Sequence, residues 1–185
     1  VKDFEVSREQ CIKRKYARQG EKILVHISNF RKVKRVDDVL KIFAKVKEQV
    51  PSKLILVGDG PEKQAIELLS RQLNLSHDVI NLGKIADPKE ILSMADLFLL
   101  PSETESFGLA ALEALAMKVP VISTNSGGLP EVNQNGVTGF LSDVGNVDEM
   151  AANATKLLKD ETMLEQFREN ALKQARKFDV ELILP

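Results

Sequence analysis

Residues 107–117 are almost wholly apolar, yet Glu113 lies in the middle of them, eight residues after Glu105. A carboxylate embedded in an apolar helix loses its hydration, which is costly unless a partner binds it. Gly108 allows a ligand to approach the backbone closely, and the free N–H groups that begin the following helix form an anion site. The pattern therefore predicts an anion site at the start of this helix, with Glu105 ionised just before it and a partner for the Glu113 carboxylate. The alternative is that Glu113 faces solvent on a half-exposed helix.

Basic residues follow the first predicted strand, in the order Arg31, Lys32, Lys34 and Arg35. Cations at the carboxyl end of a strand suit phosphate groups, so this segment is a candidate for phosphate contact. A solvated turn would explain the same charges equally well.

Two glycine-rich turns follow later strands. In GDGPE (58–62) the glycines permit close approach of the backbone, and Pro61 begins a helix. This turn suits a dinucleotide or a methyl donor as well as a purely structural bend, and it lacks the full G-x-G-x-x-G pattern. A methyltransferase would carry it after the first strand rather than the second. The second turn, TNSGGLPE (124–131), offers flexible N–H groups or is a simple connector.

The elements that position these residues alternate regularly. Strand-length apolar segments are predicted at 22–28, 53–58, 79–83, 96–102, 119–124 and 136–142. Helical patterns are predicted at 36–49, from Pro61, from Asp87, at 107–117, briefly after the NSGG turn, and twice within 146–177. Such alternation predicts an α/β fold with a parallel sheet covered by helices on both faces. Ligands bind such sheets at the carboxyl ends of the strands.

Composition limits the possible functions. The chain has 185 residues, 43% of them hydrophobic, and a formal net charge of −1, which does not indicate a nucleic-acid or anionic-membrane partner. It has no apolar run of membrane-spanning length, and its start shows no signal-peptide pattern. Cys11 is the single cysteine, which favours a reducing, cytoplasmic location, and no Cys/His spacing indicates a zinc site. Residues 1–20 are polar and basic, and the sequence is interpreted as part of a longer protein.

The sequence contains E-x7-E with S-F-G inside it, together with GDGPE, NSGGLPE and GVTGFLS in this order. With these motifs it resembles the family-four retaining glycosyltransferases. The resemblance covers about residues 20–180. It implies one half of a GT-B fold, in which two Rossmann-like domains face each other across a cleft. Residues 21–180 would be the C-terminal domain that binds the nucleotide sugar, and residues 1–20 a linker or remnant of the preceding domain. The N-terminal acceptor domain would be absent, and neither a metal nor another cofactor is expected.

The resemblance also implies roles for the residues of the E-x7-E segment. Glu113 would bind the ribose hydroxyls of the nucleotide, and these hydrogen bonds would compensate for the lost hydration of its carboxylate. Glu105 would lie beside the donor sugar. Phe107, Gly108 and Leu109 would offer backbone N–H groups to the sugar and the diphosphate.

Other positions match the family pattern less directly. Gly58 and Gly60 match the glycine turn beside the nucleotide, and the backbone near Lys84 and Ile85 matches the segment that lines the base.

The segment after the first strand departs from the family pattern. The family has G-R-L-x-x-x-K there, with both cations on the diphosphate, whereas this chain has S-N-F-R-K-V-K. Lys34 matches the lysine, and Asn29 stands at the place of the arginine. Arg31 is then the candidate to supply the missing charge. Lys34, Arg31 and Glu105 are therefore the predicted catalytic residues, and Asn29 is predicted to contact the donor.

HISNFRKVKRV resembles one subgroup of the family, whose members transfer N-acetylglucosamine from UDP-GlcNAc to L-malate in bacillithiol biosynthesis. The implied partners are thus a nucleotide-sugar donor and a small acceptor held mainly by the absent domain, without nucleic acid or an integral membrane segment. Two alternatives remain open at this point. One is a family-four transferase with a lipid or polysaccharide acceptor, and the other is a non-catalytic nucleotide-binding Rossmann module.

Overall fold

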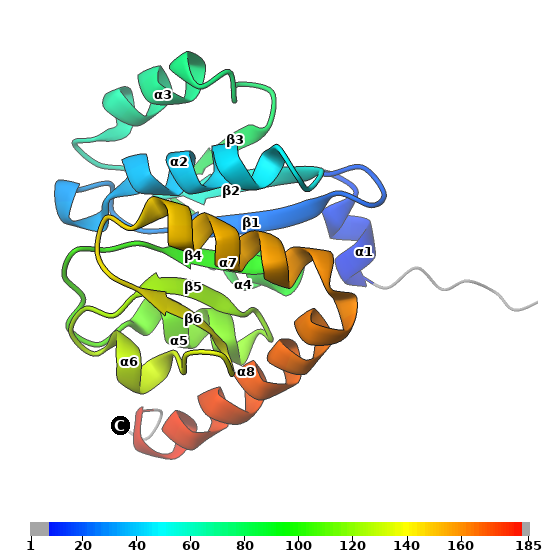
Figure 1. Ribbon diagram of the computed structural model, residues 1–185, viewed down its shortest axis with the longest axis vertical. Helices are drawn as coiled ribbons and strands as arrows, with labels where there is room; N and C mark the ends of the chain where they lie inside the picture. Colours follow the sequence, from blue (N-terminus) through cyan, green and yellow to red (C-terminus); the bar gives the residue numbers. More distant parts are fainter. Residues whose placement is uncertain (1–7, 183–185) are drawn as a thin grey trace, which may run out of the picture.

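A single sheet of six parallel strands forms the centre of the computed structural model, which describes residues 8–182 (Figure 1). The strands are β1 (Lys22–Ile27), β2 (Ser52–Val57), β3 (Val79–Gly83), β4 (Leu97–Leu100), β5 (Val121–Thr124) and β6 (Gly139–Ser142). Their order across the sheet is β3-β2-β1-β4-β5-β6. The predicted parallel α/β sheet is thereby confirmed, and its strand order is that of a doubly wound Rossmann fold.

Helices cover both faces of the sheet, as the alternation predicts. The described helices are α1 (Arg8–Lys13), α2 (Val36–Lys47), α3 (Lys63–Gln72), α4 (Lys89–Ser93), α5 (Leu109–Ala116), α6 (Leu129–Val132), α7 (Val147–Lys159) and α8 (Glu161–Leu182), with a 3-10 turn, η1, at Lys32–Lys34. Side chains of β1 alternate between two cores: Leu24 packs with α2, α3 and α7, whereas Ile23 and Val25 pack with α1, α4, α5 and α6.

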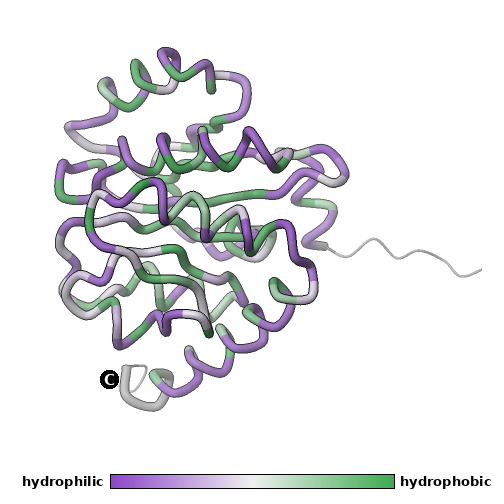
Figure 2. The backbone as a smooth tube through the Cα atoms, viewed as in Figure 1, coloured by the Kyte–Doolittle hydropathy of each residue, from purple (hydrophilic) through white to green (hydrophobic). Residues whose placement is uncertain are grey.

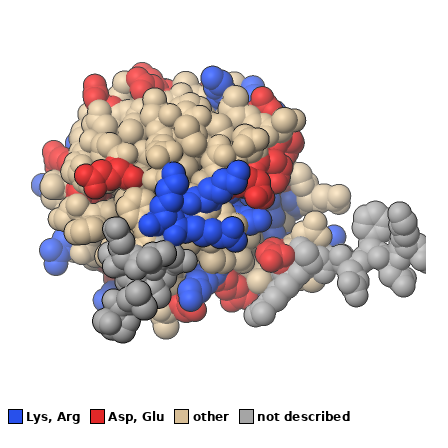
Figure 3. All heavy atoms as spheres, turned by 90° about the horizontal axis from the view of Figure 1, so that it is seen from below, with Lys and Arg blue, Asp and Glu red and all other residues tan. Residues whose placement is uncertain are grey.

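Helix α8 joins the two cores at the β6 side of the sheet. Its Leu164 and Phe167 pack in the core of α2 and α7, while Ala171 and Ala175, farther along, pack in the core of α5. In Figure 2 hydrophobic residues are concentrated in the central strands, whereas the helices alternate between hydrophobic and hydrophilic residues. Figure 3 shows Lys and Arg side chains gathered on the face where α8 lies, and α8 carries the exposed Lys173, Arg176 and Lys177. Among the described residues, no helix has the length and hydropathy to span a bilayer.

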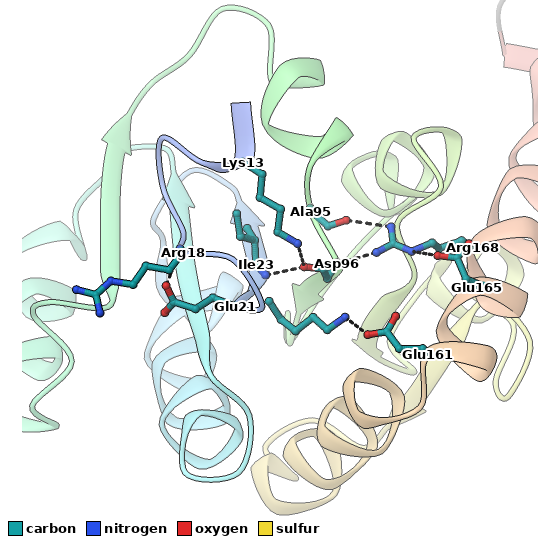
Figure 4. Close-up of polar contacts among 10 residues, drawn as sticks. Lys13, Arg18, Glu21, Ile23, Ala95, Asp96, Glu161, Glu165 and Arg168 are labelled. Atoms are coloured by element: carbon teal, nitrogen blue, oxygen red, sulfur yellow. Dashed lines mark hydrogen bonds and ion pairs between the residues drawn. The ribbon is translucent and has the colours of Figure 1, made fainter. Parts of the chain in front are cut away.

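A buried aspartate ties four segments together at the amino end of the sheet (Figure 4). The carboxylate of Asp96 accepts hydrogen bonds from the backbone N–H of Ile23 at 2.7 Å, from Lys13 Nζ at 2.9 Å and from an Arg168 Nη at 2.7 Å. Asp96 thus connects α1, β1, the start of β4 and α8. Ile12 and Ala17 are also buried in the core. Residues 8–20, within the segment predicted to be a linker or remnant, therefore pack on the domain.

Candidate functional site

The site lies where the strand order changes direction. From β1 the chain builds outward to β2 and β3, then returns to place β4 on the other side of β1. β1 and β4 pair only at Leu24–Leu97 and Val25–Phe98, so the segments that follow them separate at the carboxyl edge. Ligands bind doubly wound sheets in such a crevice. A hollow of about 370 Å³ occupies it, lined by Ile27, Ser28, Asn29, Lys34, Thr104, Glu105, Ser106, Phe107, Gly108, Leu109 and Ala110.

An ion pair spans the hollow from one side of the switch point to the other. Lys34 Nζ lies 2.6 Å from Glu105 Oε1, although the two residues are 71 positions apart. Ser102 Oγ donates to the same carboxylate oxygen at 2.9 Å. The side chains of Lys34 and Glu105 are only 22% and 12% exposed, so the pair is partly shielded from water. The structure thus places a fixed cation beside a fixed carboxylate, a pairing suited to a ligand that carries both an anionic group and hydrogen-bond donors.

A buried histidine lies beneath the hollow. His26 is fully buried, and its Nδ1 lies 2.7 Å from the Leu99 carbonyl oxygen, while its Nε2 lies 2.7 Å from Ser28 Oγ. Burial lowers the pKa of His26 to about 4, against a raising effect of the Leu99 hydrogen bond. Lys34 lowers this pKa further, and Glu105 raises it. The imidazole is therefore neutral at neutral pH.

Helix α5 begins at the rim of the hollow. Gly108, at its N-cap, has φ 66° in the left-handed region, and a Cβ on it would lie 3.0 Å from Leu129 Cδ2. The helix begins at this point, and its first N–H groups have no partner within the helix. Phe107 and Leu109 beside them are 64% and 58% exposed. A helix N-terminus with apolar neighbours thus borders the same hollow as Lys34.

The second glycine turn braces the loop that carries Glu105. A Cβ on Gly127 would lie 1.8 Å from the Glu105 carbonyl oxygen, and one on Gly128 would lie 2.7 Å from the Ser106 carbonyl oxygen. The Gly128 N–H donates to the Glu105 carbonyl at 3.1 Å. Because only glycine permits these approaches, the NSGGLPE turn positions Glu105 from behind.

Glu113 lies one helical turn beyond Leu109, along a second hollow. This hollow, of about 360 Å³, is mostly apolar and is bordered by Leu109, Leu112, Glu113, Ala116, Met117 and Phe178, together with part of the loop before α4. Glu113 is exposed, and within the described residues its carboxylate forms no hydrogen bond or ion pair. The expectation that an apolar helix embeds Glu113 is wrong, and the alternative of a half-exposed helix is correct, because α5 buries only Ala111, Ala114 and Leu115. Leu109 borders both hollows, so a single ligand could extend from Lys34 to Glu113.

The first glycine turn packs against the loop after β1. A Cβ on Gly58 would lie 1.8 Å from the Ser28 carbonyl oxygen, and one on Gly60 would lie 2.8 Å from the Phe30 backbone. Phe30 N–H donates to the Asp59 carbonyl at 2.9 Å. In this structure the two glycines allow the loops after β1 and β2 to interlock.

The remaining predicted residues lie in different places. Asn29 is exposed and lines the hollow beside Lys34. Arg31 lines a separate hollow with Glu62 and Glu103. The structure therefore does not bring Arg31 to the Lys34–Glu105 pair.

The residues predicted to line the base lie beyond β3. Lys84 is exposed there, and Ile85 is half-buried against the core of α5. Neither borders the two hollows described here.

Sequence reasoning missed the hydrogen-bonded residues beneath the site. These are His26, Ser28 and Ser102, together with Thr124, whose Oγ1 donates to the Ser102 carbonyl at 2.7 Å. The one available signal was a histidine inside an apolar strand, which is where a buried polar group needs partners. In the described part of the chain, no group of three or more His, Cys, Asp and Glu side chains could hold a metal ion.

Comparison with known proteins gives a consistent result. The family model described as "Glycosyl transferases group 1" matches residues 7–174. N-acetyl-alpha-D-glucosaminyl L-malate synthase of Bacillus anthracis is 52% identical over 162 residues, which is 85% of this chain and 42% of that protein. 2-deoxystreptamine N-acetyl-D-glucosaminyltransferase of Niallia circulans is 38% identical over 116 residues, or 62% of this chain and 30% of that protein.

Solved structures share the fold. A crystal structure of Anabaena HepE in complex with UDP superposes with a TM-score of 0.84 and 25% identity, covering 91% of this chain and 48% of that one. The chain thus spans less than half the length of each of these relatives.

Proposed function

The chain belongs to the group 1 glycosyl transferases, and from that premise we propose that it is the donor-binding half of a retaining transferase that passes N-acetylglucosamine from UDP-GlcNAc to L-malate. The resemblance at 52% identity to a synthase named for that product supports the choice of donor and acceptor. The activity belongs to a whole protein of which this chain would be one part.

The observation that carries the proposal is the pairing of Lys34 with Glu105 across the strand switch point, 2.6 Å apart and beside the start of α5. A nucleotide diphosphate needs a cation and N–H donors, and a transferred sugar needs a hydrogen-bonding carboxylate close by. Both requirements are met within one hollow.

Cleavage of the bond between the sugar and UDP builds negative charge on the β-phosphate. In the proposed mechanism Lys34 and the first N–H groups of α5 stabilise this charge, which is electrostatic catalysis of the leaving group. Glu105, held by Lys34 and Ser102, positions the sugar. Glu113 accepts the ribose hydroxyls at the other end of the nucleotide, and no metal is needed.

A double displacement, in which one of two carboxylates attacks the sugar, would need a free nucleophile at the anomeric carbon. Glu105 is already bound by Lys34 and Ser102, and Glu113 lies on the other hollow. The arrangement therefore favours a same-face substitution within the ion pair of sugar and UDP.

The acceptor is assigned to the part of the relatives' length that this chain does not span. A transferase with a lipid or polysaccharide acceptor would use the same donor half, so only the whole protein can separate the two. A cytoplasmic location is proposed with the malate acceptor.

The decisive experiment is calorimetric titration of the chain with UDP, UDP-GlcNAc, GDP and S-adenosylmethionine. We expect binding of the uridine ligands only, and loss of that binding in Glu113→Ala. Glu131→Ala, an exposed glutamate on α6 outside the two hollows, is the matched control and keeps the affinity. Binding of S-adenosylmethionine instead would contradict the proposed function. Unchanged affinity in Glu113→Ala would contradict the assignment of Glu113 to the ribose. Acceptor choice is then tested by malate-dependent release of UDP from the whole protein.

A further inference from the structure

Ser28 and His26 form a hydrogen-bonded pair at the floor of the hollow, and their protons have a fixed direction. The Leu99 carbonyl oxygen can only accept, so His26 Nδ1, 2.7 Å away, carries a proton and donates. Because burial and the nearby Lys34 keep the ring neutral, Nε2 carries none. The Ser28 hydroxyl, 2.7 Å from Nε2, therefore donates its only proton to His26.

The fold explains why His26 occupies this position. Leu99 lies one residue beyond the last backbone pair of β1 and β4, Val25–Phe98. The imidazole of His26 binds the Leu99 carbonyl at the point where the two strands separate. The geometry of the strand switch thus fixes the tautomer, and the tautomer fixes the orientation of the Ser28 hydroxyl.

With its proton committed, the Ser28 oxygen can only accept hydrogen bonds from a ligand in the hollow that it lines. The oxygens of an ionised diphosphate are also acceptors, so they gain nothing from Ser28 and repel its lone pairs. Sugar hydroxyl and amide groups, by contrast, carry the hydrogen that Ser28 needs. Lys34 and the start of α5, which line the same hollow, provide donors for the diphosphate.

We propose that Ser28, oriented by His26, accepts a hydrogen bond from an O–H or N–H of the donor sugar and turns the diphosphate toward Lys34 and α5. Ser28 is then a specificity-determining residue and His26 a positioning residue. This inference rests on the proposed function, because it requires a nucleotide sugar in the hollow.

The test compares UDP with UDP-GlcNAc in calorimetry on the chain at pH 8, where the terminal phosphate of UDP is ionised. Ser28→Ala should weaken UDP-GlcNAc binding roughly threefold to tenfold, as expected for one lost hydrogen bond between uncharged groups, and leave UDP binding within about twofold. Ser76→Ala, an exposed serine after α3, is the matched control and should change neither affinity.

A second measurement reads the proton positions without a ligand. Nitrogen-15 NMR of the imidazole should show His26 as the neutral tautomer protonated at Nδ1. Protonation at Nε2 would overturn the inference, as would an equal loss of UDP and UDP-GlcNAc affinity in Ser28→Ala. If the unmodified chain bound neither ligand, the proposed function itself would fail and this inference with it, so the two failures are distinguishable.

Discussion

At the scale of single residues, the site is a set of charges and protons held in place before any ligand arrives. Glu105 accepts hydrogen bonds from Lys34 and Ser102. His26 accepts one from Ser28 and donates one to the Leu99 carbonyl oxygen. Each contact removes a rotational choice that a ligand would otherwise have to fix, which is the physical content of preorganisation. The consequence is that substitution of Lys34 should change catalysis, substitution of His26 the pH response, and substitution of Ser28 the affinity for the donor sugar.

Lys34→Ala in the whole protein should lower kcat about 100-fold to 1,000-fold, because a preorganised donor to the leaving phosphate is lost. KM for the donor should change much less. Lys32→Ala is the matched control, since Lys32 lies in the same 3-10 turn but lines the separate hollow of Arg31. Steady-state transfer rates give the comparison, and equal losses in the two variants would contradict the role of Lys34.

His26 should make folding stability depend on pH between about 6.5 and 4. Its folded-state pKa of about 4 lies below the ordinary value of 6.5, so the unfolded chain binds the proton at pH values where the folded chain does not. Stability should therefore fall as pH falls, by up to about 3 kcal/mol across this window. Lys34 and Glu105 are the charged groups that act on this imidazole.

Denaturant titrations of the chain and of His26→Gln at several pH values measure this effect. The variant should lose the His26 share of the pH dependence while keeping the share due to the carboxylates. An identical slope in both proteins would show that His26 does not titrate as the structure indicates.

At the scale of elements, close backbone contacts and buried charges connect segments that lie far apart in the sequence. The NSGGLPE turn presses on the Glu105 loop through Gly127 and Gly128, and the loops after β1 and β2 interlock through Gly58 and Gly60. At the opposite edge of the sheet, Asp96 connects distant segments by forming ion pairs with Lys13 and Arg168. Stability and site geometry thus depend on contacts between elements.

Gly127→Ala and Gly136→Ala form a matched pair. Both glycines have positive φ, 54° and 77°, but a Cβ on Gly136 would meet nothing within 4 Å, whereas one on Gly127 would meet the Glu105 carbonyl. Gly136→Ala should cost about 1–2 kcal/mol of unfolding free energy from backbone strain. Gly127→Ala should cost about 1–3 kcal/mol more, because the loop must move. Equal costs in chemical denaturation would contradict the bracing role.

Asp96→Ala should destabilise the chain by about 3–5 kcal/mol, since it leaves Lys13, Arg168 and the Ile23 N–H without their shared acceptor. Asp148→Ala removes an exposed pair with Lys45 and should cost within about 1 kcal/mol. Urea unfolding of the two variants makes the comparison, and similar midpoints would show that the Asp96 cluster contributes little.

At the scale of the whole molecule, we propose that the chain provides one side of a site. Phe107 and Leu109 lie exposed beside the hollow, and the Lys34–Glu105 pair opens to the same region. The chain spans 42% of the synthase to which it is 52% identical. We therefore expect donor binding and catalytic turnover to separate.

The chain alone should bind UDP-GlcNAc yet transfer N-acetylglucosamine to L-malate no faster than background. Addition of the missing part of the relatives' length in one polypeptide should restore transfer. Product formation is followed by mass spectrometry, with EDTA present in a parallel sample to test the expected independence from metal. Appreciable turnover by the chain alone would show that the acceptor also binds here.

The sequence by itself determined the alternation of strands and helices, because hydrophobic periodicity and turn residues are set by near neighbours. It also determined which residues follow each strand, and so identified Lys34, Gly108 and Glu105 as candidates for one edge of the sheet. It could not determine that β4 pairs with β1, which alone brings Lys34 within 2.6 Å of Glu105.

Tertiary structure also decided the properties that depend on distant neighbours. In the folded chain Glu113 is exposed and Arg31 lines another hollow. His26 has the hydrogen-bond partners that orient Ser28. Burial, the direction of a side chain and the position of a proton are set by atoms from elements far apart along the chain. Periodicity within one segment contains no information about those atoms.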